Sequence, residues 1–451
     1  MFSQLFQTFA NCFKIPELRS RIIFTALVLG VCRLIAMTPI PGLDGVALSA
    51  FFESQSKNAG TNSVVGLYSL FTGGALEKCA VGSLGIMPYI SATIIIQLLS
   101  AVIPVLSKLS REEGGRAKII AYGRYLTVLL CLGQGLFMTL GWEHPEKAFS
   151  GFSGSLIPPD TNLWVYRIQT VAILTTATVL LMWLGEQITE RGLGNGISIL
   201  IFGGIAAGLP NAIGGLLELV RTGAMSIIVA LFIVVLVALV TFVVVFIERG
   251  QRKILVNYAR RQVGNKVYGG QSSHLPLKLN MAGVIPPIFA SSIILLPATV
   301  VGWLSTGDSM RWLKDIAGSL TPGQPIYVMF YASAIVFFCF FYTALVFNSR
   351  ETADNLKKSG AFIPGIRPGE QTARYIDKIL LRLTFAGAIY ITLVCLLPEF
   401  LILKYNVPFY FGGTSLLIIV VVTMDFMAQV QNYLMSQQYE SLLKKANFKS
   451  S

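Results

Sequence analysis

Long runs of apolar residues, each about the length of a membrane crossing, alternate along the chain with short charged segments. The clearest run, "SIIVALFIVVLVALVTFVVVFI" at residues 226–247, contains no charged residue. As a helix it would be roughly 33 Å long, enough to cross the hydrocarbon core of a bilayer. The same pattern predicts nine further spans, at residues 22–37, 80–103, 119–140, 168–185, 195–217, 281–304, 326–347, 379–402 and 410–430. The chain is therefore predicted to be an all-α polytopic membrane protein with ten transmembrane helices.

Three of the predicted spans are interrupted by glycine and proline. The interrupting residues are Gly82, Gly85 and Pro88 in the second span, Gly203, Gly204, Gly208 and Pro210 in the fifth, and Pro286 and Pro287 in the seventh. Proline removes a backbone donor and collides with the preceding helical turn. Irregular backbone survives at membrane depth only where protein buries it or where it lines a wet cavity. We expect these spans to face a central path, and the uniform span 226–247 to face lipid.

Ten spans divide naturally into two sets of five. An odd number of spans in each half makes the halves inverted if they share a fold, although no residue-level repeat is evident. We expect an N-terminal half at 1–217, a connecting hinge region at 218–225, a C-terminal half at 226–434 and a cytoplasmic tail at 435–451.

Composition and charge agree with a membrane protein. With 54% hydrophobic residues, 13% charged residues and a mean hydropathy of +0.68, the chain has too few polar side chains to cover several soluble domains. If residues 1–21 are cytoplasmic, 24 of the 35 Lys and Arg residues fall on that side and 8 on the other. This positive-inside excess predicts that both termini are cytoplasmic, and it accounts for most of the net charge of +13.

Two predicted cytoplasmic loops are longer than a connection requires. The loop at about 248–280 mixes basic residues with β-branched and aromatic ones, and we expect a protruding hairpin. The loop at about 348–378 begins like a basic helix and continues with turn signals such as Pro364 and Gly365. Long ordered loops often carry function. A docking role, binding to RNA phosphates and positive-inside bias alone all remain open.

The residue chemistry gives little support to catalysis or ion coupling. Both histidines, His144 and His274, fall in predicted loops, and no GxxxxGK[ST] motif occurs. Glu186 is placed in a short loop with Glu190, and the six cysteines show no CxxC spacing. We therefore expect no catalytic residue, no metal site, no cofactor and no enzymatic activity. Apolar residues would line the path, where they can resist ions by dewetting, unless they simply pack the bundle.

One segment, "LYSLFTGGALEKCAVGSLGIMPYI" at residues 67–90, has the pattern of neither a loop nor a span. Residues 64–78 are long enough for a short half-buried helix on the outer side. Gly73 and Gly74 would weaken that helix by about 1 kcal/mol each relative to Ala. Glu77 and Lys78 would keep its end at the wet side. A surface loop that folds onto itself is the alternative.

Several long motifs, in order, closely resemble the SecY family of bacterial protein-translocation channels. They are "LGIMPYISATIIIQLL", "GLGNGISILIF", "ERGQRKI", "HLPLKLNMAGVIPPIFASSI", "SGAFIPGIRPGEQTARYID" and "FYFGGTSLLIIVVVTMDF". The resemblance runs from about residue 15 to residue 440. It implies the central pore-forming subunit of a channel in the bacterial inner membrane, with two inverted five-helix halves. Such a channel passes unfolded secretory proteins and releases hydrophobic segments laterally into the bilayer.

The resemblance also implies particular site residues. A pore ring would comprise Ile86, Ile90, Ile197, Ile201, Ile288 and Ile418, and a plug at about 64–78 would include Leu67, Leu70, Phe71, Gly73, Gly74 and Leu76. The lateral gate would lie between spans 80–103 and 281–304, with contributions from 119–140 and 326–347. No ring position departs from an apolar residue.

The long loops would then bind the SecA ATPase motor or the ribosome, through Arg367 with Arg260, Arg261 and Lys266. Asn265 departs from the basic pattern of relatives at the tip of the first loop. SecE and SecG subunits are implied as further partners. Two alternatives from other classes stay open, a small-solute transporter and an insertase without a through-pore.

Overall fold

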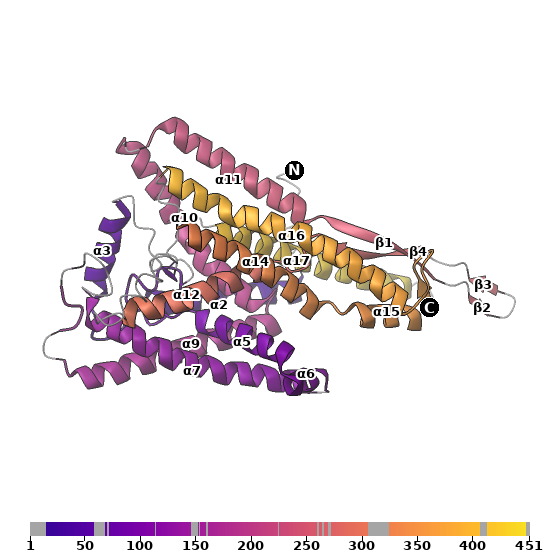
Figure 1. Cartoon of the computed structure of the whole chain (residues 1–451), viewed down its shortest axis with the longest axis horizontal. Coiled ribbons are helices and arrows are strands. Elements are labelled where there is room, and N and C mark those ends of the chain that lie inside the picture. Colours follow the sequence, from indigo (N-terminus) through magenta and orange to yellow (C-terminus); the bar gives the residue numbers. More distant parts are fainter. Residues whose placement is uncertain are drawn as a thin grey trace.

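The fold is almost entirely helical, and an elongated bundle carries a projecting β-hairpin at one end (Figure 1). This computed structural model describes residues 15–57, 68–69, 72–112, 114–145, 152, 154–158, 161–223, 225–258, 261–263, 266–268, 272–304, 324–405 and 413–447. Its helices are α2 (Pro16–Met37), α3 (Gly45–Lys57), α5 (Met87–Val102), α6 (Pro104–Arg111), α7 (Gly115–Glu143), α9 (Leu163–Arg191), α10 (Gly196–Arg221), α11 (Ile227–Glu248), α12 (Ile285–Leu304), α14 (Pro325–Val346), α15 (Ser349–Lys358), α16 (Glu370–Tyr405) and α17 (Gly413–Asn447).

The predicted spans are confirmed as helices. Among the described residues, eight helical segments are long and apolar enough to cross a membrane, and α5 and the first part of α12 are shorter apolar helices. Each of the ten predicted spans falls on one of these. The chain is a multi-pass membrane protein.

Several helices continue beyond the predicted ends of their spans. Helix α9 reaches Arg191, so Glu186 and Glu190 lie in a helix and the predicted short loop is wrong. Helix α10 continues to Arg221, into the predicted hinge, and α17 continues to Asn447, through most of the predicted tail. A span defined by its apolar residues ends at the first charges. Lys, Glu and Gln favour the helix nearly as well as Leu does, so the helix continues past them.

The prolines predicted to break two spans instead stand where helices begin. Pro88 lies in the first turn of α5, and Pro286 and Pro287 directly follow Ile285, the first residue of α12. The first turn tolerates proline because its N–H groups have no partner within the helix. Residues 80–86, predicted as the start of a span, form turns, with Gly85 at φ +57°. Among the described residues, Pro210, Pro297 and Pro398 lie inside helices.

The projecting end is built from β-strands. Strands β1 (Gln251–Tyr258), β4 (Ser272–Lys278) and β5 (Ala361–Phe362) form an antiparallel sheet in the order β4-β1-β5. Strand β1 pairs with β4 from Gln251↔Lys278 to Asn257↔Ser272. Strands β2 (Arg261–Val263) and β3 (Lys266–Tyr268) form a separate hairpin at the far tip (Figure 1). The prediction of a protruding hairpin at 248–280 is confirmed.

A single apolar cluster runs through the bundle and draws residues from α2, α5, α7, α9, α10, α12, α14, α16 and α17. Helix α11 lies at the edge of the bundle (Figure 1) and exposes side chains such as Ile228 and Phe242, as expected of a helix against lipid. The described cysteines lie buried or half-buried in apolar packing. They are Cys32, Cys79, Cys131, Cys339 and Cys395.

Candidate functional site

Two segments far apart in the sequence join at the β end of the molecule. Strand β1, from the first long loop, pairs with β5, from the second, through Asn257↔Phe362 and Tyr258↔Ala361. The strands and the start of α16 enclose a small core of their own. Its buried members are Ile254, Val256, Leu277, Ala361, Ile363, Ile376, Ile379, Leu380 and Leu383. We call the described parts of residues 251–278 and 349–383 the platform. The two loops, predicted separately, are one structural unit.

Arg367 lies exposed in the turn between β5 and α16. The turn needs the left-handed region twice, and glycine supplies it at Gly365 (φ +81°) and Gly369 (φ +107°). The Arg367 carbonyl accepts a hydrogen bond of 2.9 Å from Thr372 Oγ1. The backbone is therefore fixed while the guanidinium is presented to solvent.

The other predicted basic residues belong to the far tip rather than to this turn. Arg261 and Lys266 lie in β2 and β3, with Arg261 paired to Tyr268 and Lys266 to Val263. Their side chains, and the whole of Arg260 and Asn265, lie outside the described part of the chain. The structure thus assigns Arg261 and Lys266 to a hairpin that projects beyond the platform (Figure 1).

The platform core predicts the effect of one substitution. Ile376 is fully buried between α16 and the sheet. Ile376→Ala is expected to cost about 2–5 kcal/mol of local stability, because the cavity it leaves cannot collapse completely. Limited proteolysis of residues 251–278 in the purified protein would measure this as faster cleavage. Lys378→Ala, at an exposed position of the same helix, should leave the cleavage rate unchanged. Equal rates for the two variants would contradict a shared core.

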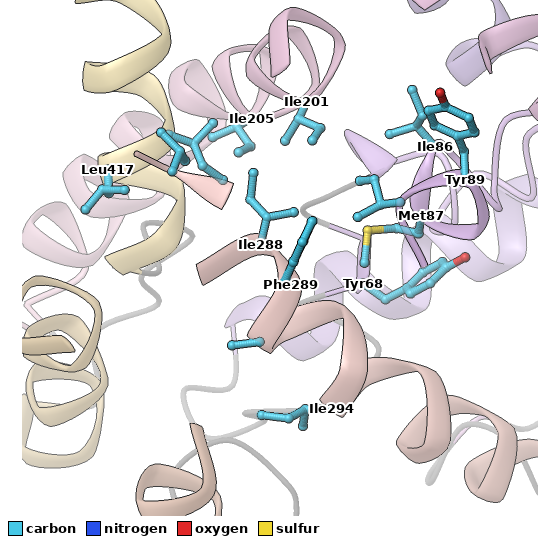
Figure 2. Packing of buried hydrophobic residues seen from close by; sticks show 14 of the residues in the cluster. Tyr68, Ile86, Met87, Tyr89, Ile201, Ile205, Ile288, Phe289, Ile294 and Leu417 are labelled. Atoms are coloured by element: carbon cyan, nitrogen blue, oxygen red, sulfur yellow. The ribbon is translucent and has the colours of Figure 1, made fainter. Parts of the chain in front are cut away.

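Most of the predicted pore-ring isoleucines lie in the central apolar cluster. Ile86, Ile90, Ile201, Ile288 and Ile418 are buried, and Ile197 is half-buried against the same cluster. Figure 2 shows Ile201 of α10 and Ile288 of α12 directed toward a shared space, whereas Leu417 of α17 lies farther away in the same buried cluster. Side chains from helices of both predicted halves therefore meet in one apolar layer.

Ile86 takes a different place. It precedes α5 as the N-cap residue, and Figure 2 shows it beside Tyr89, apart from Ile201 and Ile288. A Cβ added at Gly185 would lie 3.8 Å from Ile86 Cδ1, which places Ile86 against the α9 backbone. The structure does not bring Ile86 into the layer shared by Ile201 and Ile288.

Sequence reasoning missed three members of the buried cluster that contains this layer. Ile205 stands one turn after Ile201 on the same face of α10 and points the same way (Figure 2), so the i, i+4 spacing could have identified it. Leu417 is fully buried. Phe289 meets Phe338 of α14 edge-on, with ring centroids 5.7 Å apart. No sequence signal distinguishes Phe289 from the other aromatic residues of the chain.

The predicted lateral gate corresponds to a packed seam. Helix α12 lies against both α5 and α7, and α14 packs on α12 and α16. The edge-on ring pair of Phe289 and Phe338 belongs to this side of the bundle. Among its described residues the seam is closed by apolar contacts.

The segment predicted as a plug is described in part. Gly73, Gly74 and Leu76 lie in the described residues, whereas Leu67, Leu70 and Phe71 lie outside them. Tyr68, Ser69 and Leu76 are buried, so the segment is packed inward and the alternative of a free surface loop is wrong.

Internal hydrogen bonds fold this segment tightly. The Gly74 amide donates to the Ser69 carbonyl at 2.9 Å, and Ser69 Oγ donates to Glu77 Oε1 at 2.6 Å. Glu77 is half-buried, with Ser69 as its donor, and Lys78 is exposed. The placement of both residues at the wet side stays a prediction. Gly73 (φ +68°) and Gly74 (φ +82°) form a left-handed turn rather than weakening a helix.

The end of the segment is fixed by backbone pairing. The Ile40 amide donates to the Cys79 carbonyl at 2.9 Å, and the Val81 amide donates to the Thr38 carbonyl at 2.8 Å. Burial raises the pKa of the Cys79 thiol to about 12, so the thiol stays protonated and unreactive at neutral pH. Backbone hydrogen bonds therefore anchor residues 79–81 to the chain that follows α2. Side chains such as Arg33 and Glu77 hold the preceding turn.

Acidic residues do not form an ion-coupling site in the described part of the chain. Glu186 forms a two-pronged ion pair with Arg124 of α7, both bonds being 2.9 Å. Asp425 lies 3.7 Å from Lys278 and is 60% exposed. No cluster of three potential metal ligands occurs among the described residues.

Comparison with known proteins gives one consistent family. The SecY family profile matches residues 80–427. The "Protein translocase subunit SecY" of Vibrio cholerae is 57% identical over 439 residues, which cover 96% of each chain. That of Escherichia coli K12 is 56% identical over 434 residues, covering 96% of this chain and 95% of the relative.

Solved structures agree on the fold at much lower identity. "The structure of a protein conducting channel" aligns with a TM-score of 0.65 at 17% identity, covering 93% of this chain and 96% of the other. A SecY structure whose plug domain is described as stabilising the closed state aligns at 0.64, with the same identity and coverage. Sec61 in a canine ribosome-channel complex aligns at 0.63, again at 17% identity and with 93% and 96% coverage.

Proposed function

Because this chain belongs to the SecY family of protein translocase subunits, we propose that it forms the pore of a protein-conducting channel. It passes unfolded secretory proteins across the membrane and releases hydrophobic segments sideways into lipid. The observation that carries this proposal is the apolar layer in which Ile201 of α10 and Ile288 of α12, one from each predicted half, point toward a shared space (Figure 2).

This layer is proposed as the pore constriction. Branched side chains that meet at one depth exclude water, and a dry constriction resists ions without a charged filter. The buried state of Ile90, Ile201, Ile288 and Ile418 supports the proposal. Ile86 and Ile197 remain proposed members, because a passing chain would part α5 and α10 and turn both residues toward it.

The seam of α12 with α5 and α7 is proposed as the lateral gate. Buried apolar side chains such as Met87 of α5 and Phe289 of α12 lie together there (Figure 2), and such contacts cost little to exchange for contacts with lipid tails or with a hydrophobic segment of the client. The 1–217 and 226–434 halves are proposed to move apart along this seam, about a hinge near residues 222–226, where α10 has ended and α11 begins.

The buried turn at residues 68–78 is proposed as the plug of the resting channel. Its burial and its inward packing support this role. The backbone pairs at Cys79 and Val81 would keep the segment attached when the turn at Gly73 and Gly74 leaves the pore. We assign the plug to the outer side and both termini to the cytoplasm of a bacterium, because the positive-inside excess orients the chain in the inner membrane that way.

The platform is proposed as the docking surface for the driving partner. Sec61, which shares the fold, is known in a ribosome-channel complex. We propose the ribosome and the SecA ATPase as alternative partners here, with Arg367 as the main contact and Arg260, Arg261 and Lys266 in support. SecE and SecG are proposed as companion subunits. Energy for transport then comes from the partner, and the channel itself is passive.

Site-specific crosslinking of a stalled secretory chain tests this function. A preprotein arrested in the channel is expected to form disulfides with single cysteines placed at Ile90 or Ile288, because both line the proposed constriction. A cysteine at Ile228, on the exposed face of α11, is the matched control and should not react. The natural cysteines would first be replaced by serine or alanine.

The outcome separates the alternatives. Crosslinks confined to Ile228 or other lipid-facing positions would contradict the constriction and favour an insertase without a through-pore. A small-solute transporter would instead show saturable, gradient-coupled uptake by the purified protein in liposomes. Transport of a fully hydrophilic preprotein past Ile288 would exclude both.

A further inference from the structure

A charged residue with no part in the proposed pore lies within an apolar helix. Arg33 stands one turn before the end of α2, in a segment that otherwise reads as a membrane span. Charged side chains inside a span are costly to bury and usually serve a function. Arg33 is half-buried. It lies too far from the platform to contribute to partner docking, because the platform and the end of α2 sit at different ends of the bundle (Figure 1).

Arg33 reaches the turn proposed as the plug. Its Nη1 donates a hydrogen bond of 3.1 Å to the Gly73 carbonyl. A hydrogen bond from a charged donor is roughly twice as strong as a neutral one. Gly73 lies in the left-handed turn at the front of the segment, on the opposite side of that segment from its backbone anchor at Cys79–Val81.

The Gly73 turn is also pressed against a second helix. A Cβ built on Gly73 would lie 2.5 Å from Arg33 Nη1 and 3.0 Å from Gly204 Cα of α10. Glycine is therefore needed at position 73 for the turn to enter the space between α2 and α10. Arg33 closes that space from one side and Gly204 from the other.

The remaining hydrogen bonds of residues 68–78 stay within the same stretch of chain. Ser69 bonds to Glu77, Gly74 bonds to Ser69, and Tyr68 Oη donates to the Leu84 carbonyl just before α5. Among the described hydrogen bonds of this segment, only the bond from Arg33 joins it to another transmembrane helix. Loss of the hydrogen bond from Arg33 would leave the segment without a hydrogen bond to a neighbouring transmembrane helix among the described residues.

We propose that Arg33 is the positioning residue that holds the plug in the resting channel. The inference rests on the proposed plug role of residues 68–78. The Arg33 guanidinium would then set the equilibrium between the docked and the released state of residues 68–78. An entering chain would push the Gly73 turn out from between α2 and α10, two helices of the same 1–217 half, and would break its hydrogen bond to Arg33. The competing interpretation is that Arg33 extends outward to lipid headgroups and is indifferent to the plug.

Hydrogen–deuterium exchange tests the docking directly. In the reconstituted channel complex, Arg33→Met is expected to speed exchange of the Gly74 amide by about tenfold, because loss of a charged donor shifts the docked population by that order and the released turn exposes this amide to water. Arg33→Lys, which retains a donor, should give an intermediate rate. Arg221→Met removes an exposed arginine at the end of α10, outside the platform, and should change nothing. Unchanged exchange in Arg33→Met would overturn the proposal.

Resting ion conductance of the same variants separates this inference from the proposed function. Arg33→Met and a deletion of residues 67–77 are both expected to raise it. If only the deletion does so, the plug role stands and the role of Arg33 is wrong. If Arg33→Met speeds exchange while neither change raises conductance, Arg33 holds the segment and the plug role is wrong.

A double substitution gives a third, independent measure. Gly73→Ala would push Arg33 away from the turn, so adding Arg33→Met to Gly73→Ala should change the exchange rate by less than about twofold. If the exchange rate of the double variant rises by the product of the two single increases, the substitutions act independently. That result would contradict the proposal.

Discussion

Arg367→Glu is expected to lower motor-driven translocation by about tenfold or more while the channel assembles normally, since an exposed arginine that anchors a partner carries a large share of the binding energy. Arg367 stands on a fixed turn, with its backbone held by Thr372 and its side chain in solvent. Reversal of its charge should therefore spare the fold. Transport of a preprotein into vesicles that contain the purified complex and the motor would measure the effect.

The control for this substitution is Arg116→Glu, which makes the same charge change at the exposed start of α7, outside the platform. It should translocate at the normal rate. Salt offers a second check, because contacts between exposed charges weaken as ionic strength rises. The rate of the unsubstituted channel should fall with added salt more steeply than that of Arg367→Glu. Full transport by Arg367→Glu would remove Arg367 from the docking surface.

Deletion of residues 67–77 is expected to raise the resting ion conductance by about tenfold or more, because it removes the buried Leu76, whose apolar burial contributes about 1.5–3 kcal/mol to the closed state. The backbone pairs at Thr38, Ile40, Cys79 and Val81 lie outside the deletion and should keep the chain in register. Current across a planar bilayer that contains the complex, without preprotein, would measure it.

A shorter change gives the matched control for the deletion. Lys78→Gln alters the exposed end of the segment and leaves its buried turn in place, so its resting current should equal that of the unsubstituted channel. An unchanged current after the deletion would show that the apolar layer of Ile201 and Ile288 seals the channel without residues 67–77.

The sequence predicts the helices of the bundle well, because the hydrocarbon core imposes both length and composition. Span 226–247 coincides with α11 to within a residue at each end. Helix ends are harder to predict when they lie in water, as α9 shows by continuing to Arg191. The prolines at Pro88 and Pro286 carried a usable signal, since proline favours the first turn, and they could have predicted where α5 and α12 begin.

The arrangement of the candidate sites was less predictable because it depends on contacts between distant residues. Strand β5 has two residues, too few for any periodicity, and its pairing with β1 spans about a hundred residues of sequence. The meeting of Arg33 with Gly73 has the same origin, as does the position of Ile86 against Gly185. Sequence motifs identified which residues matter, and tertiary contacts decide what each one touches.

Helix α16 gives the platform a mechanical role. The helix begins at Glu370, directly after the turn of Arg367, and ends at Tyr405 with Pro398 inside it, a length of about 54 Å where a bilayer core is about 30 Å thick. Its first turns belong to the platform core, and its later turns pack on α14, which packs on α12. A partner that tilts the platform would therefore tilt α16 as well. The movement would reach α12, the helix at the seam, through α14.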